Sequence, residues 1–202
     1  GVEVKIINYG GIITSIKTPN KYGLLENITL GFDSLSKYEM DNLYFGAIIG
    51  RYGNRIANGK FILDNTIYTL AKNNYPNHLH GGYKGFDKRI WKATPKTNKD
   101  SVSLTLNYVS KNMEEGFPGK LHTTVLYTLT SDNSLEIEYK AKTDKKTIVN
   151  LTNHAYFNLS GNFNSDILDH ELQINADKIL PINKFLIPTG EISLVKNTPF
   201  DF

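Results

Sequence analysis

The chain has 202 residues, of which 40% are hydrophobic and 21% are charged, a composition typical of a soluble globular protein rather than a disordered segment. Its net charge is +3, from 23 basic and 20 acidic residues, an excess too small to indicate nucleic acid or an anionic membrane as a partner. The chain has no cysteine, which excludes disulfides, thiolate metal sites and cysteine nucleophiles.

The first third of the chain predicts short strands separated by turns. Alternating apolar and polar side chains predict strands over residues 1–7, 12–17 and 25–30. The run from Asp33 to Met40 starts with residues that favour helix N-termini, so we expect one helical turn there. Residues 61–63 and 67–70 predict a hairpin around Asp64-Asn65.

The clearest alternation lies in the middle of the chain and predicts half-buried antiparallel strands. These runs cover residues 102–108, 121–129 and 135–141, and we expect a further strand over His170 to Asn175. No segment has the pattern of an amphipathic helix of ordinary length, and many short strands at short spacing indicate an all-β sandwich or barrel. The chain opens inside a strand and ends on an apolar-rich turn, so we expect one sandwich domain over residues 1–202 that is incomplete at both ends.

The stretch from Asn150 to Leu159 mixes polar and apolar residues in an unusual way. As a strand, it would bury its apolar side chains, and buried polar groups need hydrogen-bond partners. Such a pattern predicts either an internal hydrogen-bond network or a surface that faces a polar ligand. His154 lies at its centre and can exchange a proton near physiological pH, so we interpret it as a general acid that acts on a sugar.

Other polar residues carry weak signals when each is taken alone. His78-x-His80 resembles the metal-binding pair of cupins, but no glutamate follows at the required distance, and we expect no metal site. Asn54 and Arg55 have an ordinary interpretation as a turn residue and a surface residue, and His80 as a loop histidine. A tyrosine such as Tyr156 is more often a core or rim residue than a platform for a sugar. Specificity comes from the order in which these patterns occur.

That order resembles the aldose 1-epimerase family, also called the galactose mutarotases. The matching blocks are Ile49-Gly50-Arg51 with Gly53 to Gly59, Asn77 to Gly82 with Gly85-Phe86-Asp87, Glu115 to Gly119, Asn150 to Leu159, and Leu186 to Glu191 with Thr198 to Phe202. They follow one another in the family's order across essentially the whole chain.

The resemblance implies a large antiparallel β-sandwich of the galactose mutarotase type. It also implies an isomerase that interconverts the α and β anomers of a free hexose such as galactose or glucose, without metal or organic cofactor. By the same resemblance, His154 is the general acid and Asn54, Arg55, His80 and Tyr156 bind the sugar. A cytoplasmic location, with neither nucleic acid nor membrane as partner, is the corresponding expectation.

The chain departs from the family in its length, because family members are considerably longer. The carboxylate that serves them as general base lies beyond the last block matched here. We therefore expect either a fragment of an active enzyme, for which a second chain carrying the C-terminal portion is one way of completing the site, or an inactive remnant. A non-catalytic carbohydrate-binding β-sandwich module is the alternative function. A glycosidase ranks last, because no pair of carboxylates is marked out for that chemistry.

Overall fold

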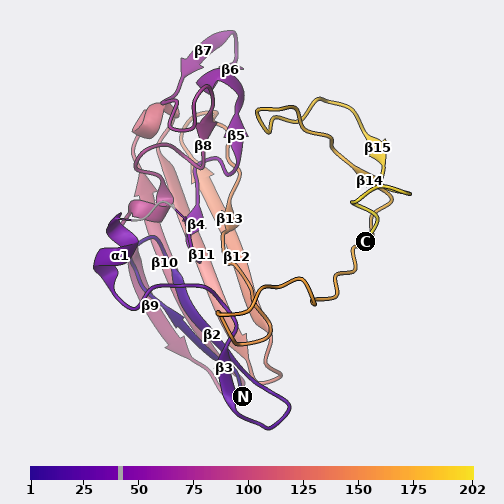
Figure 1. Cartoon of the computed structure of the whole chain (residues 1–202). Coiled ribbons are helices and arrows are strands. Elements are labelled where there is room, and N and C mark those ends of the chain that lie inside the picture. Colours follow the sequence, from indigo (N-terminus) through magenta and orange to yellow (C-terminus); the bar gives the residue numbers. More distant parts are fainter. Residues whose placement is uncertain (41–42) are drawn as a thin grey trace.

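The computed structural model describes residues 1–40 and 43–202, and its main feature is a long antiparallel sheet (Figure 1). This sheet has the strand order β12-β11-β10-β9. The strands are β9 (Lys92–Thr97), β10 (Ser101–Ser110), β11 (Leu121–Thr130) and β12 (Leu135–Thr143). Each strand pairs with its neighbour in sequence, so the sheet is a simple meander in which β9 and β12 form the two edges.

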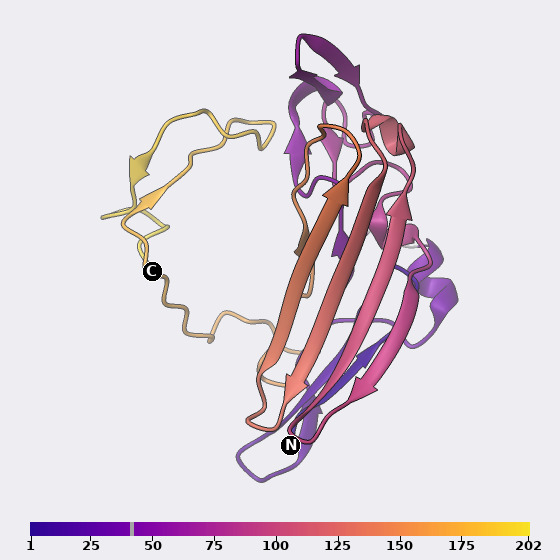
Figure 2. The ribbon, with the colours of Figure 1, turned by 180° about the vertical axis from the view of Figure 1, so that it is seen from behind.

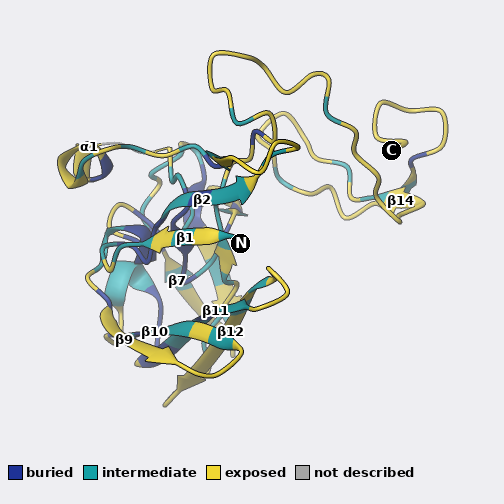
Figure 3. Cartoon of the chain, turned by 90° about the horizontal axis from the view of Figure 1, so that it is seen from below, coloured by how far each residue is buried: buried dark blue, intermediate teal, exposed yellow. Residues whose placement is uncertain are grey.

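A second layer of shorter strands packs against this sheet, as the view from below shows most clearly (Figure 3). Its three-stranded part has the order β1-β2-β3, from β1 (Glu3–Ile6), β2 (Ile13–Pro19) and β3 (Leu25–Asn27). Four two-stranded pairs complete the strands: β4 (Ile48–Ile49) with β13 (Thr152–Asn153), β5 (Arg55–Ile56) with β8 (His78–Leu79), β6 (Lys60–Leu63) with β7 (Thr66–Thr69), and β14 (Lys178–Ile179) with β15 (Ser193–Leu194).

The helices are short and lie in the connections between strands. They are α1 (Leu35–Met40) and the 3₁₀ turns η1 (Ala57–Gly59), η2 (Phe86–Lys88) and η3 (Glu114–Gly116). Within residues 1–40 and 43–202, no helix combines the length and the apolar character that a membrane-spanning segment requires.

The main core lies between the two layers and consists of apolar side chains from both. Its buried members are Ile13, Ile16, Ile48, Phe86, Trp91, Leu106, Leu121, Val125 and Tyr127. The Tyr127 hydroxyl donates to the carbonyl of Gly11 at 3.1 Å, which ties the long sheet to the turn before β2. Burial of this contiguous apolar surface provides the main driving force for packing the layers.

The buried Arg51, which follows β4, links the layer of short strands to the loop between β10 and β11 of the long sheet. Only 2% of its surface is exposed, and its guanidinium donates to five acceptors. These acceptors are the hydroxyl and carbonyl of Ser110 and the carbonyls of Lys111, Phe117 and Pro118. Arg51 therefore holds the connection between β10 and β11 in place, and its role is structural.

The all-β class and the central antiparallel strands are confirmed. The predicted hairpin is confirmed as β6 and β7, and both of its turn residues, Asp64 and Asn65, have the positive φ that two-residue hairpin turns require. The predicted helical turn is confirmed as α1 for residues 35–40. The sequence pattern missed β9, whose Pro95 is compatible with a strand only because β9 lies at the sheet edge.

Two strand predictions are wrong. Residues 170–175 form no strand, because they lie in an exposed extended segment without a neighbouring strand in the described structure. The stretch from Asn150 to Leu159 is not one strand, since only Thr152–Asn153 enters a ladder. Phe157 and Leu159 are 50% and 63% exposed, so their apolar side chains are not buried as the prediction required.

The chain after Leu159 runs away from the two layers and returns beside β5 and β8 (Figure 2). Where the segment returns, the Asn77 side chain donates a hydrogen bond to the carbonyl of Phe185 at 3.2 Å. Large apolar side chains along this segment are exposed, among them Leu168 at 83% and Ile192 at 68%. This segment therefore packs far less tightly than the strands of the two layers.

Candidate functional site

The five residues singled out in the sequence lie in or close to two pairs of short strands. Arg55 lies in β5, which pairs with β8 so that Arg55 faces Leu79, the neighbour of His80. His154 follows β13, which pairs with β4. The amide of His154 donates to the carbonyl of Ala47 at 2.9 Å, and its carbonyl accepts from Gly46 at 3.1 Å. Short backbone ladders thus place residues that are distant in sequence at one location.

His80 and His154 form the centre of this location. Their ring centroids lie 5.1 Å apart, and the ring planes are almost perpendicular at 88°. The Tyr156 ring also lies 5.1 Å from that of His154. Among the described residues, no hydrogen bond engages the His154 imidazole, so both of its nitrogens are available to a bound molecule.

Asn54 and Arg55 adjoin the histidine pair through His80. The amide of Asn54 donates to Nδ1 of His80 at 2.9 Å, and the amide of His80 donates to the carbonyl of Asn54 at 3.1 Å. The Arg55 guanidinium donates to the side-chain oxygens of Asn74 at 3.1 Å and Asn54 at 3.3 Å. The planar fork of Arg55 is thereby held in a fixed orientation.

The hydrogen bond from Asn54 also determines the protonation of His80. Because Nδ1 accepts, the proton of the neutral ring lies on Nε2, which then acts as a donor. Burial lowers the pKa of His80 to about 4, with smaller contributions from His154, Arg55 and His78. His80 is therefore a neutral hydrogen-bond donor at pH 7, and no carboxylate is among the charged groups that influence its pKa.

The asparagines of the central stretch bind backbone groups. Asn153 donates to the carbonyl of Gly46 at 2.8 Å and accepts from the amide of Ala155 at 2.9 Å. Asn150 donates to the carbonyl of Gly53 at 3.1 Å, and Asn158 bonds within its own turn. The sequence pattern predicted either an internal hydrogen-bond network or a surface that faces a polar ligand. For these asparagines the structure shows the internal network.

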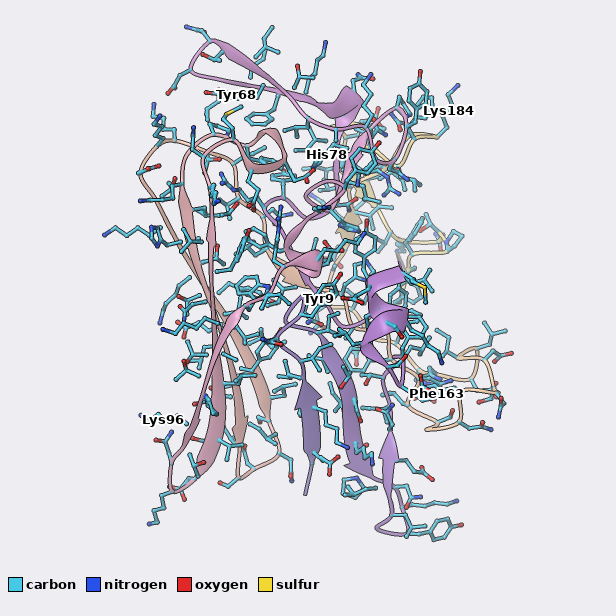
Figure 4. All side chains as sticks on the ribbon, turned by 90° about the vertical axis from the view of Figure 1, so that its left-hand side faces the viewer. Tyr9, Tyr68, His78, Lys96, Phe163 and Lys184 are labelled. Atoms are coloured by element: carbon cyan, nitrogen blue, oxygen red, sulfur yellow. The ribbon has the colours of Figure 1, made fainter. Side chains whose placement is uncertain are left out.

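His78 and His80 have different surroundings and do not act as a pair. His78 is fully buried, its Nδ1 lies 2.8 Å from the carbonyl of Ala71, and its ring contacts Phe117 edge-on. Figure 4 shows it enclosed by side chains, whereas Lys96 at the end of β9 extends into solvent. In the described part of the chain, no group of three or more histidine, aspartate or glutamate side chains is arranged to hold a metal ion.

The carboxylates close to these segments are engaged elsewhere. Glu115 accepts from the amides of Tyr83 and Lys84, both at 3.1 Å. Glu114 accepts from the hydroxyls of Tyr108 at 2.7 Å and Ser110 at 2.6 Å. These glutamates therefore hold a loop and a strand end through hydrogen bonds.

Asp87 is a buried carboxyl that lines a small cavity together with Tyr44, and 7% of its surface is exposed. Its Oδ1 has no hydrogen-bond partner among the described residues, and its Oδ2 lies 4.0 Å from Nζ of Lys88. Burial raises the pKa of Asp87 to about 6, because it outweighs the opposing effects of Lys88 and Arg89. The ionised carboxylate is therefore an unfavourable element of the folded state.

We expect Asp87→Asn to stabilise the protein at pH 7 but not at pH 3.8. A carboxyl whose pKa is raised on folding contributes stability that is present below its ordinary pKa of 3.8 and lost as the pH rises through about 6. The free energy of unfolding of the variant relative to wild type should increase by roughly 2 kcal/mol over that range. Urea unfolding at several pH values measures this difference.

The exposed Asp100 supplies the matched control for this comparison. Asp100→Asn should leave the free energy of unfolding within about 0.5 kcal/mol of wild type at each pH. A stabilisation by Asp87→Asn that is equal at pH 3.8 and pH 7 would contradict the assignment of the effect to ionisation of Asp87.

The structure also brings in two residues that the sequence pattern did not single out. Tyr44 precedes β4, and its ring lies 4.8 Å from that of His80 and 5.6 Å from that of His154. Asn74 orients Arg55 as described above. Tyrosine and asparagine are common in loops, and only the three-dimensional arrangement distinguishes these two from the others.

Comparison with known proteins determines the family. A model of the family described as aldose 1-epimerase matches residues 1–202. The chain belongs to the aldose 1-epimerase family. The resemblance seen in the sequence is thus confirmed over the whole chain.

Relatives within the aldose 1-epimerase family come from mammals and bacteria. Galactose mutarotase of Bos taurus is 47% identical over 200 residues, which cover 99% of this chain and 57% of the bovine protein. Aldose 1-epimerase of Escherichia coli K12 is 40% identical over 202 residues, which cover 100% of this chain and 57% of the bacterial protein. The chain thus spans little more than half of the length of these relatives.

Solved structures of the family share the fold. An aldose epimerase homologue from C. elegans superposes with a TM-score of 0.87 at 32% identity, covering 100% of this chain and 61% of the nematode chain. Galactose 1-epimerase from Lactobacillus acidophilus superposes with a TM-score of 0.86 at 30% identity, covering 100% of this chain and 58% of the bacterial chain. The two-layered β-architecture described here is therefore that of the aldose 1-epimerases.

Proposed function

We propose that this chain supplies the sugar-binding surface and the general acid of an aldose 1-epimerase that interconverts the α and β anomers of a free hexose such as galactose or glucose. The observation that supports this proposal most directly is the pair of imidazole rings of His80 and His154, 5.1 Å apart and flanked by Asn54, Arg55 and Tyr156. The named relatives are galactose mutarotases and aldose 1-epimerases, which agrees with this chemistry.

The reaction needs one proton donor and one proton acceptor. A base removes the proton from the anomeric hydroxyl, the bond between C1 and the ring oxygen breaks, and the acid protonates that oxygen. Rotation about the C1–C2 bond exposes the other face of the aldehyde, and reclosure reverses the proton transfers. Only protons move, so the proposed reaction needs no cofactor, and each positioned group contributes about 10²–10⁴-fold to the rate.

The two histidines have different roles in this proposal. His80 is neutral near pH 7 because its pKa is about 4, and its Nε2 donates a hydrogen bond to a sugar oxygen. His154 has an imidazole without intramolecular hydrogen bonds and serves as the acid at the ring oxygen. Arg55 and Asn54 hold further hydroxyls, and the Tyr156 ring borders the sugar.

We further propose that residues 1–202 form a single sandwich domain completed by a second chain that carries the portion of the family's length not matched here. A groove of about 410 Å³ opens between β2 and β12, and its walls include Ile16, Ile137 and Phe157. The outer edge of β12 pairs with no strand in the described structure. Apolar walls beside an unpaired strand edge are suited to a further strand.

The general base is the decisive contribution of this second chain. The charged groups that influence the pKa of His80 are His154, Arg55 and His78, and no carboxylate is among them. The same observation favours the alternative function, a carbohydrate-binding module that binds an aldose without turning it over. The cytoplasmic location expected from the family resemblance is part of the main proposal.

Polarimetry of freshly dissolved α-D-galactose tests the main proposal against this alternative. We expect the 202-residue chain alone to bind galactose in a calorimetric titration without accelerating mutarotation over buffer. Adding the portion of bovine galactose mutarotase that the match leaves uncovered should then produce acceleration.

The outcomes of this experiment separate the possibilities. Binding without acceleration, even after an interaction with the added portion is seen by size-exclusion chromatography, would favour the binding module. Acceleration by the 202-residue chain alone would show that a carboxylate within it completes the site, and would overturn the proposed second chain. Absence of galactose binding in every mixture would contradict both functions.

A further inference from the structure

Tyr44 contacts both histidines of the candidate site, although it lies outside every sequence block matched to the family. The three ring centroids form a triangle with separations of 4.8 Å from Tyr44 to His80, 5.6 Å from Tyr44 to His154 and 5.1 Å between the histidines. The rings of Tyr44 and His80 meet edge-on at 71°. A rotation of either imidazole towards Tyr44 is therefore blocked by an aromatic ring.

The backbone at Tyr44 is held in a conformation that bulky residues rarely adopt. Its φ is +60°, and the φ of His80 in contact with it is +51°. Such conformations persist only where the surrounding structure maintains them, and they cluster at functional sites. The carbonyl of Tyr44 accepts from the amide of Ala47 at 3.1 Å, and Ala47 in turn accepts from His154 at 2.9 Å. The same short loop thus supports Tyr44 and His154.

The environment of Tyr44 keeps its side chain neutral. Tyr44 lines a cavity of about 20 Å³ together with Asp87 and apolar residues. Burial, with a smaller effect of Asp87, raises the pKa of Tyr44 to about 12. Tyr44 therefore exchanges no proton near pH 7, and its contribution to the site is packing.

We propose that Tyr44 is a positioning residue whose ring fixes the relative orientation of the His80 and His154 imidazoles. The purpose of this role rests on the proposed epimerase function, because a general acid acts only within hydrogen-bond reach of the atom it protonates. The packing itself does not depend on that function. It therefore admits a test on the unliganded chain.

The test is a pH titration of the histidine side chains by NMR in Tyr44→Leu, Tyr44→Phe and wild type. Removal of the ring in Tyr44→Leu should move the pKa of His80 from about 4 towards its ordinary 6.5, because the imidazole becomes hydrated. His154, Arg55 and His78 remain and keep it below that value. The ring-to-ring NOE between His80 and His154 should be lost in the same variant. Tyr44→Phe should retain both the low pKa and the NOE.

Tyr156→Leu is the matched control, because within the described structure the Tyr156 ring contacts the rings of His154 and Phe45 and not that of His80. Tyr156→Leu should leave the pKa of His80 at about 4, and that result would support the proposal. An unchanged pKa and NOE in a folded Tyr44→Leu would overturn the proposal. So would a Tyr44→Phe variant that loses both, since the ring would then not be the group responsible. Neither outcome bears on galactose turnover, so this failure and failure of the proposed function are distinguishable.

Discussion

Replacement of His154 by alanine is expected to lower epimerase turnover by about 10²–10⁴-fold while the fold remains intact. The imidazole makes no hydrogen bond within the described structure, and the backbone bonds that hold the residue, to Ala47 and Gly46, do not involve the side chain. The loss should therefore fall on proton transfer to the ring oxygen. Polarimetry with α-D-galactose, on the chain completed by the uncovered portion of the bovine relative, measures it.

His122 provides the matched control for this substitution. It lies exposed in β11, away from the histidine pair, and His122→Ala should leave turnover unchanged. Circular dichroism and thermal unfolding of His154→Ala should match wild type. A His154→Ala variant that retains full turnover would remove His154 from the mechanism, even if the family assignment stands.

Replacement of Arg51 by alanine should have the largest effect on stability, a loss of about 3–5 kcal/mol in the free energy of unfolding. The substitution leaves buried acceptors of Ser110, Phe117 and Pro118 without their donor, and unsatisfied buried groups are costly. It also creates a cavity where a 2% exposed side chain was packed. Chemical denaturation of the 202-residue chain measures the loss.

Two further variants show whether the guanidinium is responsible. Arg51→Lys keeps a charge but cannot reproduce the planar fork, so it should also destabilise the chain. Lys140→Ala removes an exposed cation that contacts Glu138 at 2.9 Å, and it should change the free energy of unfolding by no more than about 1 kcal/mol. Equal stability of Arg51→Ala and Lys140→Ala would show that the network around Arg51 is not structural.

Arg51 and Arg55 lie four residues apart in one family block and yet have opposite roles. Arg51 is enclosed and donates to five acceptors of the β10–β11 connection. Arg55 is partly exposed and donates to Asn54 and Asn74 beside the histidine pair. The short chain path from β4 to β5 thus supplies both a structural clamp and a candidate sugar contact.

Local patterns in the sequence sufficed to predict much of the fold. The alternation matches the burial along most of β11 and over residues 135–140 of β12, because neighbouring side chains of a strand point to opposite faces, whereas in β10 Val102 is 48% exposed and the burial does not alternate. Asp64 and Asn65 predicted the β6–β7 turn because they tolerate positive φ. Alternation alone does not predict whether a neighbouring strand is available for pairing. Residues 170–175 alternate in this way and yet form no strand.

For the candidate site, the sequence by itself sufficed to recognise the family, because the order of its blocks is specific, and it predicted the five residues Asn54, Arg55, His80, His154 and Tyr156. Only the tertiary structure decided that these residues lie together, that Arg51 is buried and that Tyr44 packs against both histidines. Contacts of this kind join residues far apart in sequence. They depend on how β4 pairs with β13 and β5 with β8, and two-residue ladders leave no periodic signal along the chain.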